Sequence, residues 1–130
     1  MAVFRDGKAL VARRARAPLL GLYSLPGGVV EIGETLHEAA LRELDEEVGV
    51  TAEIVAFNDH VESIVRDDQG VRAHYVIASF VARWTGGEAR TSEEADSVLW
   101  IDPLAAGDLP TTPGLEAILA RAASLIKACP

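Results

Sequence analysis

The stretch GGVVEIGETLHEAALRELDEEVGV, residues 27–50, decides the fold because it joins a glycine turn to a helix in one continuous run. Thr35 and Glu38 have the spacing of a capping box, in which each side chain bonds the backbone N–H of the other residue. Gly49 is a suitable residue to end the helix, since glycine readily adopts the left-handed conformation needed there. The stretch therefore predicts a helix over residues 35–48.

The glutamates of this helix are placed on an unexpected face. On a helical wheel with Glu43 at zero, Glu47 falls at about +40° and Glu46 at about −60°. That arc also holds Ala40 and borders Leu44, so the acids share the apolar side of the helix. Like charges there, close to the negative end of the helix dipole, are unfavourable without a counter-ion.

Two interpretations of this acidic face remain. A solvated face is possible if the helix frays before Glu46. Otherwise the spacings i, i+3 and i+4 place oxygen ligands for a hard divalent cation, Mg²⁺ or Mn²⁺, with substrate phosphates completing the coordination. We favour the cation site.

The rest of the chain reads as strands, loops and one further helix. Strand patterns flank a turn at Asp6 and Gly7, and they recur in residues 22–25, 52–58, 60–65, 71–84 and 98–101. Loops are expected at residues 15–21, 67–70 and 86–97, and a helix opened by Pro113 is expected to reach residue 128. These elements predict a single α/β domain over residues 1–130, with a mixed sheet layered between helices.

Composition narrows the class of protein. The 130 residues carry a net charge of −8, which argues against passive binding to nucleic acid. No apolar run is long enough to span a bilayer, no signal peptide is recognisable, and the single Cys129 cannot form an internal disulfide, so a cytoplasmic protein is expected. The first strand begins abruptly at Met1: either the sheet starts there, or part of an edge strand lies upstream.

A family resemblance follows from the same stretch. Gly28, Glu34 and the segment RELDEEVGV (residues 42–50) reproduce the Nudix box, GX5EX7REUXEEXGU, with Leu44 and Val50 at the bulky aliphatic positions U. The chain therefore resembles the Nudix hydrolases. The resemblance implies an α/β/α sandwich around a mixed sheet, and hydrolysis of a nucleoside diphosphate linked to another moiety.

The resemblance also implies roles for the residues of the box. The metal-binding groups would be Glu43, Glu46, Glu47 and the carbonyl of Gly27. Arg42 would orient the glutamates by ion pairing, and Glu34 would support the loop. Gly28 would permit a backbone conformation that brings the loop near the metal, and Gly49 completes the motif.

Residues outside the box have less specific patterns. The base that accepts a proton from water comes from the helix in some family members and from a later loop in others. Here Glu94, or its neighbour Glu93, is the candidate in the loop, with two solvated acids as the alternative. Arg14, in a cluster with Arg13 and Arg16, is the candidate for contacting a phosphate, although solvated strand-edge charges are common.

The substrate is expected by resemblance to be ADP-ribose, cleaved to AMP and ribose 5-phosphate. The alternatives are a (d)NTP pyrophosphohydrolase that removes damaged nucleotides, and a nucleotide-sugar sensor without turnover. A small-molecule partner is expected, with no nucleic acid and no membrane, and the protein is expected to be a monomer or a homodimer.

Overall fold

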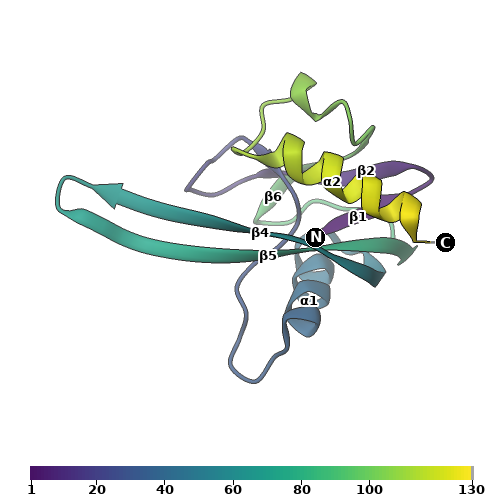
Figure 1. Ribbon diagram of the computed structural model, residues 1–130, viewed down its shortest axis with the longest axis horizontal. Helices are drawn as coiled ribbons and strands as arrows, with labels where there is room; N and C mark the ends of the chain where they lie inside the picture. The colour runs from purple at the N-terminus through teal and green to yellow at the C-terminus, as the bar shows by residue number, and fades with distance from the viewer. Residues whose placement is uncertain (130) are drawn as a thin grey trace.

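A mixed β-sheet lies between two helices in the computed structural model, which describes residues 1–129 (Figure 1). The strands are β1 (Ala2–Arg5), β2 (Lys8–Arg14), β3 (Tyr23–Ser24), β4 (Thr51–Asp67), β5 (Gly70–Gly86) and β6 (Ala95–Ile101). The helices are α1 (Leu36–Val48) and α2 (Leu115–Ala128), and a 3₁₀ turn, η1, covers Ala106–Asp108. The predicted α/β sandwich with a mixed sheet is confirmed.

The strand order explains why the sheet is mixed. It runs β3-β2-β1-β5-β4, with β6 paired to β2. Strands β1 and β5 are parallel, with Val3 opposite Ala82, and the other pairings are antiparallel. The pairing of β2 with β6 brings the segment just before β6 to the same side of the molecule as the loop that leads into α1.

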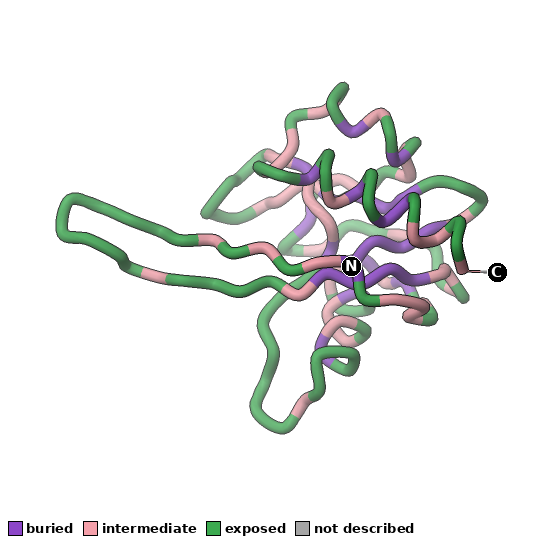
Figure 2. The backbone as a smooth tube through the Cα atoms, in the orientation of Figure 1, coloured by how far each residue is buried: buried purple, intermediate pink, exposed green. Residues whose placement is uncertain are grey.

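Each face of the sheet has its own apolar core. Leu44 and Val48 of α1 pack with Leu10 on one face, while Leu119 of α2 packs with Val11 on the other. Successive side chains of a strand point to opposite faces, so neighbours such as Leu10 and Val11 serve different cores. The buried positions gather where the helices cover the sheet (Figure 2).

The predicted ends of α1 are confirmed. The Thr35 hydroxyl accepts a hydrogen bond from the Glu38 N–H at 3.1 Å, and the Glu38 carboxylate accepts one from the Thr35 N–H at 3.2 Å. Gly49 has φ 71°, the left-handed conformation in which glycine avoids the cost of a Cβ, and its N–H donates to the Asp45 carbonyl.

Three boundaries differ from the sequence prediction. The runs 52–58 and 60–65 form one strand, β4, because bulges near Ile54 and Phe57 absorb the break in the alternating pattern. Residues 95–97, predicted as loop, belong to β6, because pairing with β2 orders them. Helix α2 begins at Leu115, because Gly114 at φ 86° separates Pro113 from it.

The β4–β5 hairpin extends far beyond the rest of the sheet (Figure 1). We call its distal part, residues 59–67 and 70–79, the hairpin arm. Strand β1 pairs with β5 only at Val81–Arg83, so within the described residues the arm is a two-stranded ribbon. Among residues 1–129, no helix is long and apolar enough to cross a membrane.

Candidate active site

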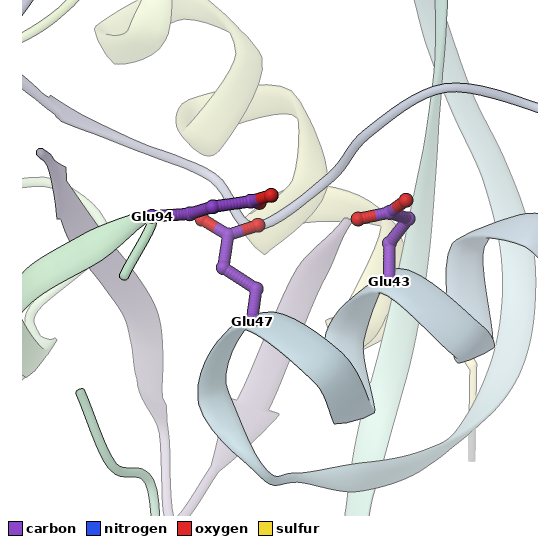
Figure 3. Close-up of side chains that lie close together, drawn as sticks. All are labelled: Glu43, Glu47 and Glu94. Atoms are coloured by element: carbon purple, nitrogen blue, oxygen red, sulfur yellow. The ribbon is translucent and has the colours of Figure 1, made fainter. Parts of the chain in front are cut away.

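Three carboxylates meet between α1 and the start of β6. Glu43 and Glu47 lie one turn apart on α1, and Glu94 comes from the segment just before β6 (Figure 3). One carboxylate oxygen from each lies within 4.8 Å of the others. An all-oxygen set at this spacing matches the ligand preference of hard divalent cations such as Mg²⁺ and Mn²⁺.

Glu47 is the most electrostatically strained of the three. Burial raises its pKa above the ordinary value, and the charges of Glu94 and Glu43 raise it further. A hydrogen bond of 3.0 Å from the Gly27 N–H to Glu47 Oε2 acts in the opposite direction. A cation among these oxygens would relieve the repulsion, so the donor set fits a metal.

Gly28 makes room for this cluster. A Cβ at position 28 would lie 2.3 Å from the Glu43 carboxyl carbon and 2.4 Å from its Oε2, which is a severe overlap. The expected close approach of the loop at Gly28 does not depend on a positive φ, which this residue does not have. What position 28 requires is the absence of a side chain, because the loop passes directly over Glu43.

Arg42 ties the loop to the helix. Its Nε and Nη2 donate to the two carboxylate oxygens of Glu34 at 2.7 and 2.9 Å, and Nη2 also donates to the Val29 carbonyl at 2.9 Å. Its Nη1 donates to Glu43 Oε1 at 2.8 Å and to Glu46 Oε2 at 3.1 Å. The guanidinium therefore pairs with the helix glutamates, as expected, and orients Glu43 toward the cluster.

Glu34 is hydrogen-bonded both to the loop before α1 and to Arg42. It accepts from the Glu31 N–H at 2.9 Å in addition to its two bonds from Arg42. The hydrogen bonds from Arg42, first, and from the Glu31 N–H lower the pKa of Glu34 to about 2. Glu34 is therefore fully ionised near neutral pH, and it fixes the path of the loop before α1.

Glu46 does not share the buried face. Its side chain is 60% exposed, against 14% for Glu43, and it lies outside the three-carboxylate cluster. The prediction that all three helix glutamates face inward is wrong for Glu46, because Arg42, one turn earlier, holds it on the outer flank of α1. The first turn is exposed as well, with Leu36 at 51%.

The arginine cluster separates into three different environments. Arg13 pairs with Asp96 at 2.6 Å, and Arg14 Nε donates to the Pro18 carbonyl at 2.8 Å. Arg16 pairs with Glu93 at 3.1 Å and lines a cavity of about 220 Å³ together with Glu46, Ser92, Glu93 and Glu94. Because Glu94 belongs to both, this cavity adjoins the carboxylate cluster.

Sequence reasoning brought some of these residues together and missed others. Glu43 and Glu47 are adjacent as expected, whereas Glu94, predicted as a base, also joins the carboxylate cluster. Gly27 contributes its N–H to Glu47, and its carbonyl as a ligand stays a prediction. Only the acidic pair at positions 93 and 94 signalled the loop's part in the site.

A larger hollow of about 670 Å³, lined by residues including Lys8, Asp102 and Lys127, contains none of the site residues.

The fold is therefore that of an α/β protein with a mixed sheet between two helices. Its candidate site is a group of carboxylates that lies beneath a glycine-containing loop. The chain belongs to the NUDIX domain family, whose model matches residues 1–122. This confirms the resemblance seen in the box.

Relatives with different names match the chain. An "ADP-ribose pyrophosphatase" of Methanocaldococcus jannaschii is 34% identical over 75% of this chain and 56% of its own length. A "Putative 8-oxo-dGTP diphosphatase 2" of Mycobacterium tuberculosis is also 34% identical, over 92% of this chain and 84% of its own. The chain spans little more than half the length of the first two curated relatives it matches, 56% and 59%.

Solved structures agree with the fold. A MutT NUDIX hydrolase from Burkholderia pseudomallei superposes with a TM-score of 0.76 at 28% identity, covering 92% of each chain. The NUDIX domain of Shewanella oneidensis NrtR, solved in complex with ADP ribose, has a TM-score of 0.75 at 22% identity, covering 96% of this chain and 82% of that one.

Proposed function

We propose that this protein is a divalent-cation-dependent pyrophosphohydrolase that cleaves a nucleoside diphosphate linked to another group. The observation that carries the proposal is the convergence of Glu43, Glu47 and Glu94 on one small space. Mg²⁺ is the proposed cation, with Mn²⁺ as the alternative, since both take oxygen ligands. When bound, such a cation neutralises phosphate charge and lowers the pKa of water.

The residues of the chain divide the remaining work. Glu43 and Glu47 would hold the cation from α1. The Gly27 carbonyl is a further proposed ligand, and so is Glu46, which lies outside the cluster but lines the cavity beside Glu94. Arg42 fixes the position of Glu43 and joins it to the loop through Glu34. The Glu94 carboxylate, which comes from a loop and not from the helix, accepts the proton of the attacking water.

An arginine beside the cluster supplies positive charge for the substrate. The cavity next to Glu94 is lined by carboxylates and by the guanidinium of Arg16. Phosphate oxygens entering this acidic space need a positive partner besides the cation, and a guanidinium suits them well. We assign this contact to Arg16 in place of Arg14, because Arg16 lines this cavity and Arg14 is not among its lining residues.

ADP-ribose is the proposed substrate, giving AMP and ribose 5-phosphate. The relative from Methanocaldococcus jannaschii named for this activity, and the NrtR domain solved with ADP ribose, support it. A (d)NTP is the second candidate substrate. The support for this second candidate comes from relatives named 8-oxo-dGTP diphosphatase and CTP pyrophosphohydrolase, which match over 92% of this chain.

Product analysis of the purified protein with Mg²⁺ tests the proposal, against ADP-ribose, dinucleotides, nucleotide sugars and (d)NTPs. AMP plus ribose 5-phosphate from ADP-ribose, at the highest kcat/KM of the panel, is the expected result. Preferred release of pyrophosphate from a triphosphate would move the assignment to the second candidate. Tight cation-dependent binding of one ligand without any turnover would overturn hydrolysis and favour a sensor.

A further inference from the structure

The larger hollow, beside α2, is a candidate for a second binding site. Its walls come from three distant parts of the chain: the turn between β1 and β2, the segment after β6, and α2 itself (Figure 1). Its volume of about 670 Å³ lies within the range usual for small-molecule sites. None of the residues that line it has a role in the proposed hydrolysis.

Both lysines of the protein line this hollow. The sequence contains ten arginines but only two lysines, Lys8 and Lys127, which lie near opposite ends of the chain. A lysine in the last turn of a helix, such as Lys127, is favoured by the helix dipole. The dipole does not account for Lys8, which begins β2, so the placement of both lysines at one hollow calls for a shared explanation.

Neither lysine is used to hold the fold together. Within residues 1–129, no ion pair and no hydrogen bond engages either ammonium group. Arginines such as Arg13 and Arg42, in contrast, are paired with carboxylates of the protein. A lysine ammonium is a compact charge on a flexible stem and binds phosphate well as a point charge. Two unpaired ammonium groups at one hollow therefore indicate a ligand with a phosphate group.

The acids of the hollow indicate what else the ligand carries. Asp6 and Asp102 also line it, and their carboxylates would repel a bare phosphate. An ionised carboxylate only accepts hydrogen bonds, so these two groups suit a ligand with hydroxyl donors. Asp102 Oδ1 accepts from the Leu104 N–H at 2.9 Å, which orients this carboxylate at the end of β6.

The wall formed by α2 suits the same ligand. Ser124 adds a hydroxyl group three residues before Lys127, a spacing that places the two side chains on one face of the helix. Ala120 and Ala123 add small apolar surface, against which the C–H face of a sugar ring can pack. We propose that the hollow binds a sugar phosphate, with the two lysines on its phosphate and the two aspartates on its hydroxyl groups.

This site is separate from the carboxylate cluster. Strands β2 and β6 are paired along their length, with Ala9 opposite Ile101 beside the hollow and Arg14 opposite Ala95 beside Glu94. At about 3.3 Å per residue, the length of β2 separates the two sites by roughly 20 Å. Binding in the hollow therefore requires neither the proposed cation nor turnover.

Nuclear magnetic resonance of the full chain with ¹³C-labelled lysine tests the proposal, because only two lysine side chains give signals. Glucose 6-phosphate is the probe, added in the presence of EDTA at constant ionic strength. Both lysine signals are expected to shift together and to saturate with one Kd. A shift of only one signal, or shifts that grow without saturation, would overturn the proposal.

The lysines and a distant arginine form a matched set of variants. Lys8→Gln is expected to weaken binding about tenfold, as for the loss of one charged hydrogen bond, and to reduce the shift of the Lys127 signal. Arg66→Gln removes the same charge from the hairpin arm, and it should bind the probe as the wild type does. Equal weakening in both variants would indicate an effect of net charge alone and contradict the site.

Two further comparisons test the identity of the ligand and its location. Inorganic phosphate should bind about tenfold more weakly than glucose 6-phosphate, and Asp102→Asn should bring the two affinities closer together. Equal binding of both probes to the wild type would contradict the role of the aspartates. If Arg16→Gln loses binding while Lys8→Gln keeps it, the phosphate lies in the carboxylate site and the proposal is wrong. None of these measurements involves hydrolysis, so the proposed function stands or fails separately.

Discussion

At the scale of single residues, the negative charge of Glu47 is unfavourable in the folded protein. A carboxylate whose pKa is raised in the folded state destabilises the fold where it is ionised, because the unfolded chain carries that charge more easily. Glu47 therefore lowers the stability of the metal-free protein near neutral pH. The proposed ligand role would account for this costly placement.

Replacing Glu47 with Gln is expected to reduce turnover about 100-fold or more, because a proposed cation ligand is lost. Removing an inward charge should leave the melting temperature of the metal-free protein unchanged or raise it. Steady-state kinetics and thermal unfolding without metal measure the two effects. Near-normal turnover in this variant would sink the cation assignment.

Gly28 and Gly27 form a natural pair for testing the fit of the loop over Glu43. A Cβ at position 28 overlaps the Glu43 carboxylate, whereas a Cβ at position 27 meets nothing within 4 Å. We expect Gly28→Ala to weaken Mn²⁺ binding about tenfold, of the order seen when groups that orient ligands are lost. Gly27→Ala should bind Mn²⁺ as the wild type does. Titration followed by electron paramagnetic resonance gives both affinities, and equal affinities would contradict the role assigned to Gly28.

At the scale of elements, the ion pair between Arg16 and Glu93 joins the loop after β2 to the segment before β6. Arg16→Gln should raise KM about 10- to 100-fold with a smaller change in kcat, as expected for losing one charged hydrogen bond to substrate. Glu93→Gln should lower KM, since it frees the guanidinium that Glu93 now holds. General damage to the loops would not raise KM in one variant and lower it in the other.

The control for this pair is Arg72→Gln at the tip of the hairpin arm, where an exposed arginine is also paired with an acid, Asp67. Its KM should equal that of the wild type. If Arg16→Gln and Arg72→Gln have the same KM while the wild type hydrolyses a diphosphate, the phosphate contact belongs to another residue.

The loop before α1 depends on pH through Glu34. Its pKa is lowered from 4.5 to about 2 in the folded protein, so its contribution to stability is complete above about pH 4.5 and is lost as the pH falls toward 2. The urea midpoint of Glu34→Gln should therefore lie below that of the wild type at pH 6 and converge with it near pH 2. A difference between the two proteins that stays constant over this range would contradict the assignment.

Local signals explain which elements the sequence could predict. The caps of α1 depend on Thr35, Glu38 and Gly49, which are all close in the chain, and they were predicted correctly. The orientation of Glu46 was wrong because a wheel ignores side-chain pairing, here with Arg42. The place of Glu94 beside α1 results from the pairing of β2 with β6, and a distant pairing of this kind leaves no local pattern.

At the scale of the whole molecule, the sheet separates two cores, and α1 is held by only one of them. Leu44 is fully buried in that core, so Leu44→Ala should destabilise the protein by about 2–5 kcal/mol. Leu41→Ala is the comparison, because Leu41 lies on the same helix and is 37% exposed. Urea unfolding measures both, and an equal loss in the two variants would contradict the packing of α1.

The sequence also predicted the fold class, but it did not predict the length of the β4–β5 hairpin. The Nudix box predicted the family, and the order of strands and helices predicted the layers. The strand patterns of residues 60–65 and 71–84, divided by the loop expected at 67–70, correctly placed the two strands of the hairpin. Nothing local in that pattern shows where the neighbouring strand β1 stops, so the projection of the arm beyond the sheet could not be foreseen.

The pairing of β2 with β6 has a consequence for the protein as it is being made. Glu43 and Glu47 are synthesised early, but the third carboxylate is residue 94, and the strand that follows it ends at Ile101. A ribosome must therefore release most of the chain before the three acids can meet. During that interval the growing polypeptide carries an incomplete site, and the proposed hydrolytic activity is withheld until the sheet closes.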